Sequence, residues 1–192
     1  MPADNATEVL AVVNPDTGDP TGILIPRSLA HTTGAWHRTV HVCVWAADDG
    51  RLLLQRRAAA KAACPGAWDV SVAEHVQPGE TCEAAALRGL EEELGLVAVP
   101  GGHGNDATAA LTGPSPPGHR RSVYDVPPVL DREVVETWHV RGVGLGARLA
   151  PDPAEVEEVR WVSLGELRRE VGGAPERFTP WCLEQGRWQG WW

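Results

Sequence analysis

The sequence predicts a single mixed α/β domain. Segments with the period-two alternation of strands stand before and after a stretch with helical spacing. The resulting order of strand, helix, strands and helix is typical of this fold class. The chain has 192 residues, 43% of them hydrophobic and 22% charged, which suits one globular domain with a full core.

The first predicted strands precede the helix. Valines alternate with other residues over 40–45, which predicts a strand, and the sequence Asp-Asp-Gly at 48–50 predicts a turn into a second strand from Leu52. A further short strand is expected over about 68–72. Together these segments favour a β-rich first half.

The central helix has clear limits and an apolar side. Thr81 suits its N-cap, and Gly95 suits the left-handed residue that follows a helix. Its apolar side consists of three leucines at helical spacing, Leu87, Leu90 and Leu94. Glu92 and Glu93 fall on a different face, so the helix is expected to pack by its leucines and to present both carboxylates elsewhere.

The second half begins with a segment rich in glycine and proline, 100–128, which we expect to form one long surface loop. Beyond it, the spacing predicts a strand in "REVVETWHVRGVGL", a strand over about 157–162, a short helix over about 164–171 and a final helix with an irregular tail.

Composition excludes several classes of function. The net charge of −9 disfavours binding to a nucleic acid polymer or to an anionic membrane surface, whereas a small phosphorylated molecule remains suitable if a divalent cation supplies positive charge. The four cysteines form no CxxC pair, which argues against a zinc site. No secretory signal or bilayer-spanning run occurs, so the expectation is a cytoplasmic location, with an organelle left open. The oligomeric state cannot be read from the sequence.

The stretch "AEHVQPGETCEAAALRGLEEELGL", residues 73–96, carries the candidate chemistry. Three consecutive glutamates stand near a helix C-terminus, where anions are disfavoured. Mg²⁺ prefers carboxylate oxygens and binds substrate phosphates as well, so a bound cation would relieve the repulsion. The alternative is a solvated acidic face in which Arg88 pairs with Glu92 at i,i+4.

This stretch resembles the signature of the Nudix hydrolase family, G-x5-E-x7-R-E-U-x-E-E-x-G-U, where U is aliphatic. Glu80 and Arg88 match the first glutamate and the arginine, and the remaining matches in register are Leu90, Glu92, Glu93, Gly95 and Leu96. The resemblance implies a Nudix fold, a mixed β-sheet between helices (α/β/α), in which residues 74–96 form a loop-helix-loop that binds Mg²⁺ or Mn²⁺. It also implies cleavage of a diphosphate linkage, with Arg88 orienting the glutamates.

The resemblance sets the expected organisation of the chain and its metal ligands. Residues 1–30 would be a β-rich lead-in, 31–181 the Nudix domain and 182–192 a C-terminal tail. The expected metal ligands are Glu80, Glu92, Glu93 and Glu133, and the expected catalytic residues are Arg88, Glu92 and Glu93. Arg56, Arg57 and Trp68 are candidates for contacting the substrate, with surface solvation and packing as alternatives.

Two positions depart from the signature. Glu74 stands where the signature has its opening glycine, and Gly89 stands where it has the glutamate after the arginine. In many members that second position supplies a metal ligand. Either another residue, such as Glu74 or Glu133, replaces this carboxylate, or catalysis is weak or absent and the protein is a diphosphate-binding module.

Segments outside the signature resemble the branch of the family that contains isopentenyl diphosphate isomerases. They are "LLLQRRAAAKAACPGAWDVSVAEHVQPGE", "AHTTGAWH", "DRE" and "FTPW". His31, His37 and His75 fall near the histidines that hold the isomerase metal, and Asp131 and Glu133 fall near its acidic ligands. Having weighed a metal cluster of His31, His37 and His41, we expect histidines with ordinary hydrogen bonds.

One substitution separates the chain from the isomerases. The isomerase requires a cysteine two residues before the histidine matched by His75, and here that residue is Ala73. A methyl group cannot transfer a proton to or from an allylic carbon. We therefore expect a metal-dependent hydrolase of a small diphosphate compound, such as a nucleoside diphosphate derivative, and rank isomerase activity below it.

Overall fold

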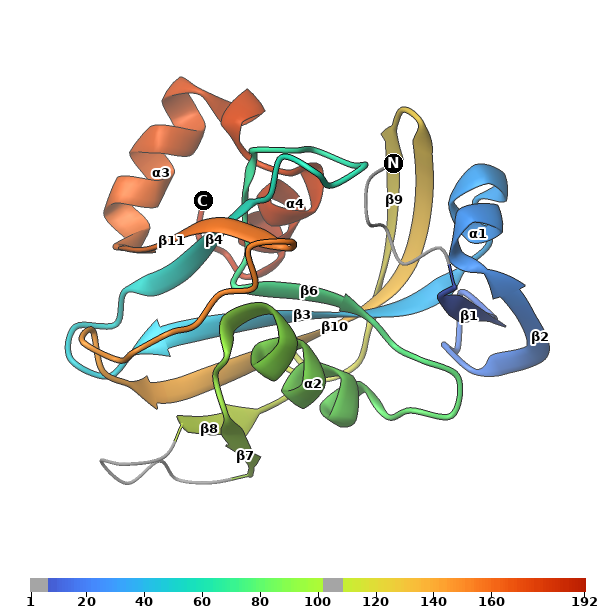
Figure 1. Cartoon of the computed structure of the whole chain (residues 1–192), viewed down its shortest axis with the longest axis horizontal. Helices are drawn as coiled ribbons and strands as arrows, with labels where there is room; N and C mark the ends of the chain where they lie inside the picture. Colours follow the sequence, from blue (N-terminus) through green and yellow to red (C-terminus); the bar gives the residue numbers. More distant parts are fainter. Residues whose placement is uncertain (1–6, 102–108) are drawn as a thin grey trace.

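A mixed sheet forms the centre of the computed structural model, which describes residues 7–101 and 109–192 (Figure 1). In spatial order its main strands are β11 (Val156–Val162), β4 (Leu52–Arg57), β3 (His37–Ala46), β10 (Val129–Val143), β8 (Ala109–Thr112) and β7 (Ala98–Pro100). Three further strands join them: β5 (Trp68–Asp69) beside β4, β6 (Val72–His75) beside β3, and β9 (Arg120–Val126) beside β10. β3 and β10 are parallel.

Helices cover both faces of this sheet, as the sequence predicts. α2 (Cys82–Leu94) crosses one face, whereas α3 (Leu164–Gly173) and α4 (Pro180–Trp188) lie on the other (Figure 1). A short 3₁₀ helix, Pro175–Arg177, joins α3 to α4. The N-terminal segment forms a separate two-stranded sheet, β1 (Val9–Val13) with β2 (Pro20–Pro26), followed by α1 (Arg27–Thr33).

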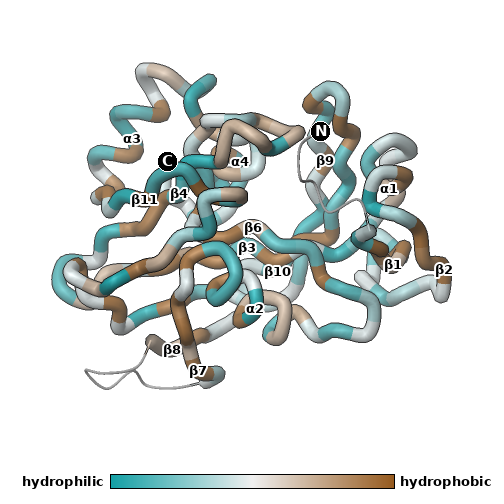
Figure 2. The backbone as a smooth tube through the Cα atoms, viewed as in Figure 1, coloured by the Kyte–Doolittle hydropathy of each residue, from teal (hydrophilic) through white to brown (hydrophobic). Residues whose placement is uncertain are grey.

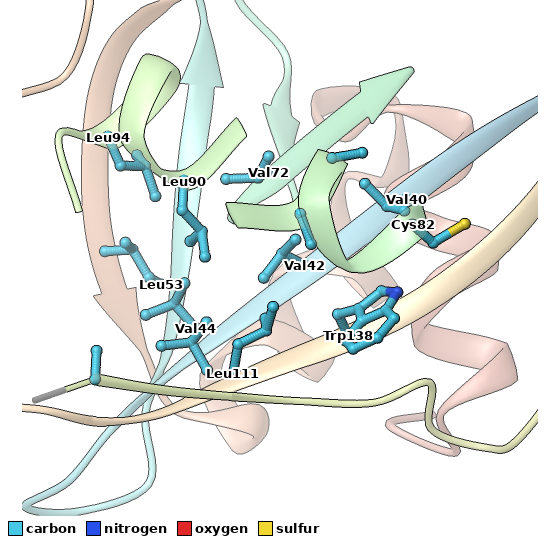
Figure 3. Close-up of a cluster of buried hydrophobic side chains, with 14 of the residues drawn as sticks. Val40, Val42, Val44, Leu53, Val72, Cys82, Leu90, Leu94, Leu111 and Trp138 are labelled. Atoms are coloured by element: carbon cyan, nitrogen blue, oxygen red, sulfur yellow. The ribbon is translucent and has the colours of Figure 1, made fainter. Parts of the chain in front are cut away.

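The core beneath α2 fixes the position of the acidic helix. Leu90 and Leu94 point from α2 toward the sheet, where Leu53 and Val44 lie, and Leu111 and Trp138 belong to the same buried cluster (Figure 3). Each fully buried leucine contributes about 1.5–3 kcal/mol through the apolar surface removed from water. The other face of β3 packs on a second cluster, in which α3 and α4 contribute residues such as Leu167 and Cys182.

Local sequence signals are confirmed at the ends of the elements. Thr81 caps α2, since its Oγ1 accepts a hydrogen bond of 3.1 Å from the Ala84 N–H. Gly95 ends the helix with φ +62°, in the left-handed region that suits glycine. The predicted 48–50 turn joins β3 to β4, with Gly50 at φ +68°. α4 runs past residue 182, and Trp191 in the expected tail is 4% exposed.

The expectation of one loop over 100–128 is corrected, because the described part of this segment contains β8 and β9; residues 102–108 lie outside the description. β9 forms a hairpin with β10. Its buried side is polar, with Arg120 and Ser122 beside Tyr124, so the strand lacks an apolar stripe. Figure 2 shows hydrophilic and hydrophobic residues mixed along β9, which explains why hydropathy did not reveal it.

The strand expected over 68–72 is split between β5 and β6. Ser71 occupies the break, and its Oγ donates 2.6 Å to the Leu53 carbonyl and accepts 2.8 Å from the Val44 N–H. This side chain links β4 to β3 at the point where the two strands separate. Within the described ranges, no helix combines the length and apolar character needed to cross a membrane.

Candidate active site

The candidate site is a cleft of 390 Å³ at the edge of β6. β10 pairs along one edge of β3, and the other edge is shared by β6, opposite Thr39 to Val42, and by β4, at Trp45. β4 and β6 therefore diverge from each other. The cleft lies beside β6, and side chains from both faces of β6 reach the cleft. The cleft is also lined by residues of α2, of the N-terminal segment and of the chain after β4.

Three histidines and two carboxylates meet on the side of β6 away from α2. Strand register places Glu133 opposite His37, and Thr39 opposite His75. Asp131 precedes Glu133 on the same face of β10, and α1 adds His31. The three imidazole rings lie 5.0–5.5 Å apart between centroids. We call these five residues, His31, His37, His75, Asp131 and Glu133, the histidine cluster.

Two polar atoms of the histidine cluster, His31 Nε2 and Glu133 Oε2, are buried without a hydrogen-bond partner among the described residues. His37 Nε2 lies 3.2 Å from Asp131 Oδ1 as an ion pair. Buried polar atoms are normally paired, so the unpartnered atoms of His31 and Glu133 suit a further ligand. Ligand atoms of His31, His37 and His75, and those of His37, Asp131 and Glu133, lie within 4.8 Å of one another in each set. Imidazole and carboxylate together suit Mn²⁺, Zn²⁺ or Fe²⁺ as well as Mg²⁺.

The hydrogen bonds of two rings also favour a cation. His37 Nδ1 lies 2.9 Å from the Ala35 carbonyl, and His75 Nδ1 lies 2.8 Å from Glu8 Oε1. A neutral ring that donates from Nδ1 carries its lone pair on Nε2, which is the atom that binds a metal. His75 Nε2 is thereby available to the centre of the cluster, His37 Nε2 lies 3.2 Å from Asp131 Oδ1 there, and the residues present fit a divalent metal ion.

The electrostatics of the cluster suit a divalent cation. Burial, together with the charge of Asp131, raises the pKa of Glu133 to about 8. Against the opposing effect of burial, the hydrogen bond and charge of His37 lower the pKa of Asp131 to about 2. Burial lowers the pKa of His31 to about 4. Glu133 thus stays protonated at neutral pH, and His37 supplies the positive charge beside Asp131. A bound divalent cation would supply positive charge to both carboxylates instead.

Arg88 organises the other side of the cleft. Its Nε and Nη2 donate to the two oxygens of Glu80, each at 3.0 Å, and its Nη1 donates to Glu92 at 3.1 Å. Nη2 also donates to the His75 carbonyl at 2.9 Å, which ties α2 to β6. Arg88 thus has the orienting geometry that the resemblance implies. The ligand role of Glu80 stays a prediction: in the structure its oxygens bind Arg88 and the Gln77 N–H.

Glu92 and Glu93 both line the cleft but in different environments. The side chain of Glu92 is 60% exposed, and its recorded partner is Arg88, as in the alternative of a solvated acidic face. Glu93 is 6% exposed, and its Oε2 accepts a 2.7 Å hydrogen bond from Gln55 Nε2. Burial, and then the charge of Glu74, raises the pKa of Glu93 well above its usual range. The buried Glu93 carboxylate is therefore fixed by Gln55, whereas the exposed Glu92 carboxylate is fixed only by Arg88.

The three candidate substrate contacts lie in two places. Arg57 lines the cleft, with its Nη1 3.4 Å from buried Asp69. Arg56 faces a separate cavity and lies 3.6 Å from Glu157. Trp68 borders that second cavity and is packed in the core, with the Arg160 guanidinium 4.1 Å from its ring centroid. Only Arg57 of these three is positioned to meet a ligand in the main cleft.

The structure also adds residues that the sequence analysis did not select. Glu8 and Lys61 line the cleft, and no pattern within either segment marks them, because Glu8 meets a partner 67 positions away. The expectation of ordinary hydrogen bonds for the histidines holds for His37 Nδ1, which lies 2.9 Å from the Ala35 carbonyl, whereas His31 Nε2 is buried without a hydrogen-bond partner among the described residues. His41 lies outside the cluster of ligand atoms, with Nδ1 3.0 Å from Arg120 Nη2 and 3.1 Å from Gln185 Oε1.

Fold and site together define an α/β protein whose acidic helix and histidine cluster face one polar cleft. The NUDIX domain model matches residues 35–182 of the chain. The protein belongs to the Nudix family, and its fold is the Nudix fold.

Similar proteins place the chain within this family. It is 36% identical to an isopentenyl-diphosphate Delta-isomerase of Cereibacter sphaeroides over 152 residues, 79% of this chain and 77% of that protein. It is 32% identical to the isomerase of Brevibacterium linens over 175 residues, 91% of this chain and 88% of that one. Among solved structures, DR0079 from Deinococcus radiodurans superposes with a TM-score of 0.57 at 23% identity, covering 86% of this chain and 90% of that one. This last likeness shows the fold alone.

Proposed function

We propose that the protein is a metal-dependent hydrolase that cleaves the diphosphate linkage of a small organic diphosphate. The observation that carries the proposal is the composition of one cleft. Four residues of the histidine cluster (His31, His75, Asp131 and Glu133) line it together with Glu93 and the basic residues Arg57 and Lys61, and no cysteine is among its lining residues in the described chain. Family membership supports diphosphate cleavage in general terms.

Different residues of the cleft have different roles in binding the cations and the diphosphate. The histidine cluster holds one divalent cation, and Glu93, with Glu92 beside it, holds or faces the cation that accompanies the diphosphate. A bound Mg²⁺ or Mn²⁺ supplies charge neutralisation and lowers the pKa of a bound water. Arg57 donates to phosphate oxygens, oriented by Asp69 and by the Ala63 carbonyl. Gln55 fixes the Glu93 carboxylate, which keeps it aligned with the reacting phosphorus.

Isomerisation of isopentenyl diphosphate is the activity named for the two relatives described above. Ala73 opposes it. Strand register sets Ala73 opposite His41, so its methyl group borders the cleft beside the histidine cluster. Proton transfer to carbon at this position has no thiol to perform it. Binding of a prenyl diphosphate, without proton exchange, is compatible with the site.

A second candidate is a diphosphate-binding module without turnover. Gly89 favours it, because the signature carboxylate is absent from α2 at this position. Binding would then rest on the same cations and on Arg57, and no product would form.

A substrate screen tests the proposal. Prenyl diphosphates, nucleotide sugars and dinucleotides would be incubated with the protein and Mg²⁺ or Mn²⁺, and phosphate or monophosphate release measured. We expect metal-dependent release that Glu93→Gln abolishes and Glu91→Gln, an exposed neighbour on the same helix, leaves unchanged. Calorimetric binding of a diphosphate without release would favour the binding module. No release and no binding at high protein concentration would overturn both.

A further inference from the structure

Gly89 and Glu74, the two departures from the Nudix signature, face each other in space. A Cβ atom on Gly89 would lie 3.1 Å from Glu74 Cβ and 3.3 Å from Glu74 Cγ. It would also lie 2.7 Å from Cγ1 of Val72, a separation that real Cβ atoms do not show. Glycine is therefore needed at position 89 because β6 approaches α2 there, and the stem of Glu74 fills part of the space.

The Glu74 carboxylate lies beside Arg88 in the cleft that Glu93 also lines, and one of its oxygens is within 4.8 Å of ligand atoms of Glu8 and His75. Its Oε2 lies 3.3 Å from Arg88 Nη1, and its Oε1 accepts a 2.8 Å hydrogen bond from the His75 N–H. Its side chain is 19% exposed and lines the cleft. Alternation along β6 puts it on the face toward α2, opposite to the face that carries His75.

We propose that Glu74 supplies, from β6, the metal-binding carboxylate that the family signature places on the helix at position 89. Relative to the signature, glycine and glutamate have exchanged positions across the contact between β6 and α2. The carboxylate ligand is therefore kept, but it comes from β6 instead of α2. This assignment rests on the proposed function, and it names Glu74 and Glu93 as the pair that grips the cation accompanying the diphosphate.

Glu93 provides an independent indication that a ligand belongs there. It is a buried carboxylate that lines the cleft, and Gln55 is the one hydrogen-bond donor recorded to it among the described residues, at Oε2 alone. Around it, Glu74, Glu80 and Glu92 share the single guanidinium of Arg88. The excess of negative charge around this buried carboxylate is suited to a hard divalent cation.

The alternative role for Glu74 is structural, as an anchor for Arg88. Mn²⁺ titration by calorimetry and electron paramagnetic resonance separates the two roles, and thermal melting accompanies each variant. Glu93→Gln first identifies the binding event on the α2 side. We expect Glu74→Gln to weaken that same event by about tenfold or more, while Glu91→Gln on the exposed side of α2 changes nothing. A Glu74→Gln protein with a lower melting temperature and unchanged Mn²⁺ binding would overturn the proposal.

The exchange can also be reversed. Val72→Ala with Glu74→Gly removes the carboxylate and the close approach, and adding Gly89→Glu places a carboxylate back on the helix. We expect the triple variant to bind Mn²⁺ about tenfold or more tightly than the double variant. A folded triple variant without recovery would contradict the exchange. Because these readouts measure cation binding, they stay informative if no diphosphate is hydrolysed, a result that would count against the proposed function alone.

Discussion

His75 and Glu8 form a partly buried pair, with imidazole Nδ1 2.8 Å from carboxylate Oε1, and this pair connects the N-terminal segment to the histidine cluster. The side chains of both residues are 12–13% exposed. Against the effect of burial, the hydrogen bond from His75 lowers the pKa of Glu8 to about 2, so the carboxylate is charged at neutral pH. A charged acceptor holds the ring with Nε2 directed at the cluster.

Replacing Glu8 by glutamine should therefore weaken metal binding without removing a ligand. An amide is a poorer acceptor for the Nδ1 hydrogen, so the ring loses orientation and basicity. We expect Mn²⁺ affinity at the histidine cluster to fall about 10–100-fold, as for other residues that orient a metal-bound histidine. Calorimetry on Glu8→Gln against Glu91→Gln provides the comparison. Equal affinities in the two proteins would show that Glu8 does not act through His75.

The metal-free protein should lose stability as pH rises from 6.5 to 8. The native state keeps a proton on Glu133 up to a pKa of about 8, whereas the unfolded chain releases it near 4.5. The free energy of unfolding then falls by about 1.4 kcal/mol per pH unit for this proton. The raised pKa of Glu74, about 7 because of burial, acts in the same direction.

Urea unfolding in the presence of a chelator measures this dependence. Above pH 6.5, His31 and His41, whose pKa burial lowers, are neutral in both states, so they do not mask it. Against the effect of burial, Asp131 raises the pKa of His37, which acts in the same direction as Glu133. Glu133→Gln should therefore reduce the decline, and saturating Mn²⁺ should abolish it in the native protein. An unchanged slope in Glu133→Gln would contradict the assignment of the proton to this carboxyl group.

Ala73→Cys should change which reaction the cleft supports. The native protein is expected to incorporate no deuterium into isopentenyl diphosphate in D₂O, because a methyl group carries no exchangeable proton. A thiol at this position would lie beside the histidine cluster, on a lining residue of the cleft. We expect detectable exchange in the variant, followed by NMR, and Ala62→Cys serves as a control on the same cleft. Exchange by the native protein would refute the ranking of hydrolase over isomerase.

Gly89→Ala should destabilise the protein although alanine is the better helix former. In an open helix this substitution gains about 1 kcal/mol. Here the added Cβ would lie 2.7 Å from buried Val72, which cannot move freely. We expect a lower melting temperature, against an unchanged or higher one for Gly172→Ala in α3, where no atom lies within 4 Å of the added group. A stabilised Gly89→Ala protein would show that α2 and β6 are not in close contact.

Sequence reasoning reached the elements whose signals are local. The α2 boundaries follow from Thr81 and Gly95, and the apolar face follows from leucine spacing, because caps and periodicity act within one helix. β9 was missed because its buried side is polar. β9 forms because it pairs with β10, and its own hydropathy does not mark it as a strand.

The site was foreseen in part for the same reason. The glutamates of α2 form one continuous motif, whereas the histidine cluster assembles from α1, β3, β6 and β10. Strand register brings Glu133 beside His37 across 96 positions, and no local pattern carries that information. Resemblance pointed to these histidines, and the structure adds that ligand atoms of His31, His37 and His75 lie within 4.8 Å of one another.

Anomalous diffraction at the manganese edge, from crystals grown with Mn²⁺ and a non-hydrolysable diphosphate, tests the central claim most directly. The account predicts one peak between the Nε2 atoms of His31 and His37 and the carboxylates of Asp131 and Glu133, and a second beside Glu74 and Glu93. Crystals that bind the diphosphate with no manganese at either position would contradict it.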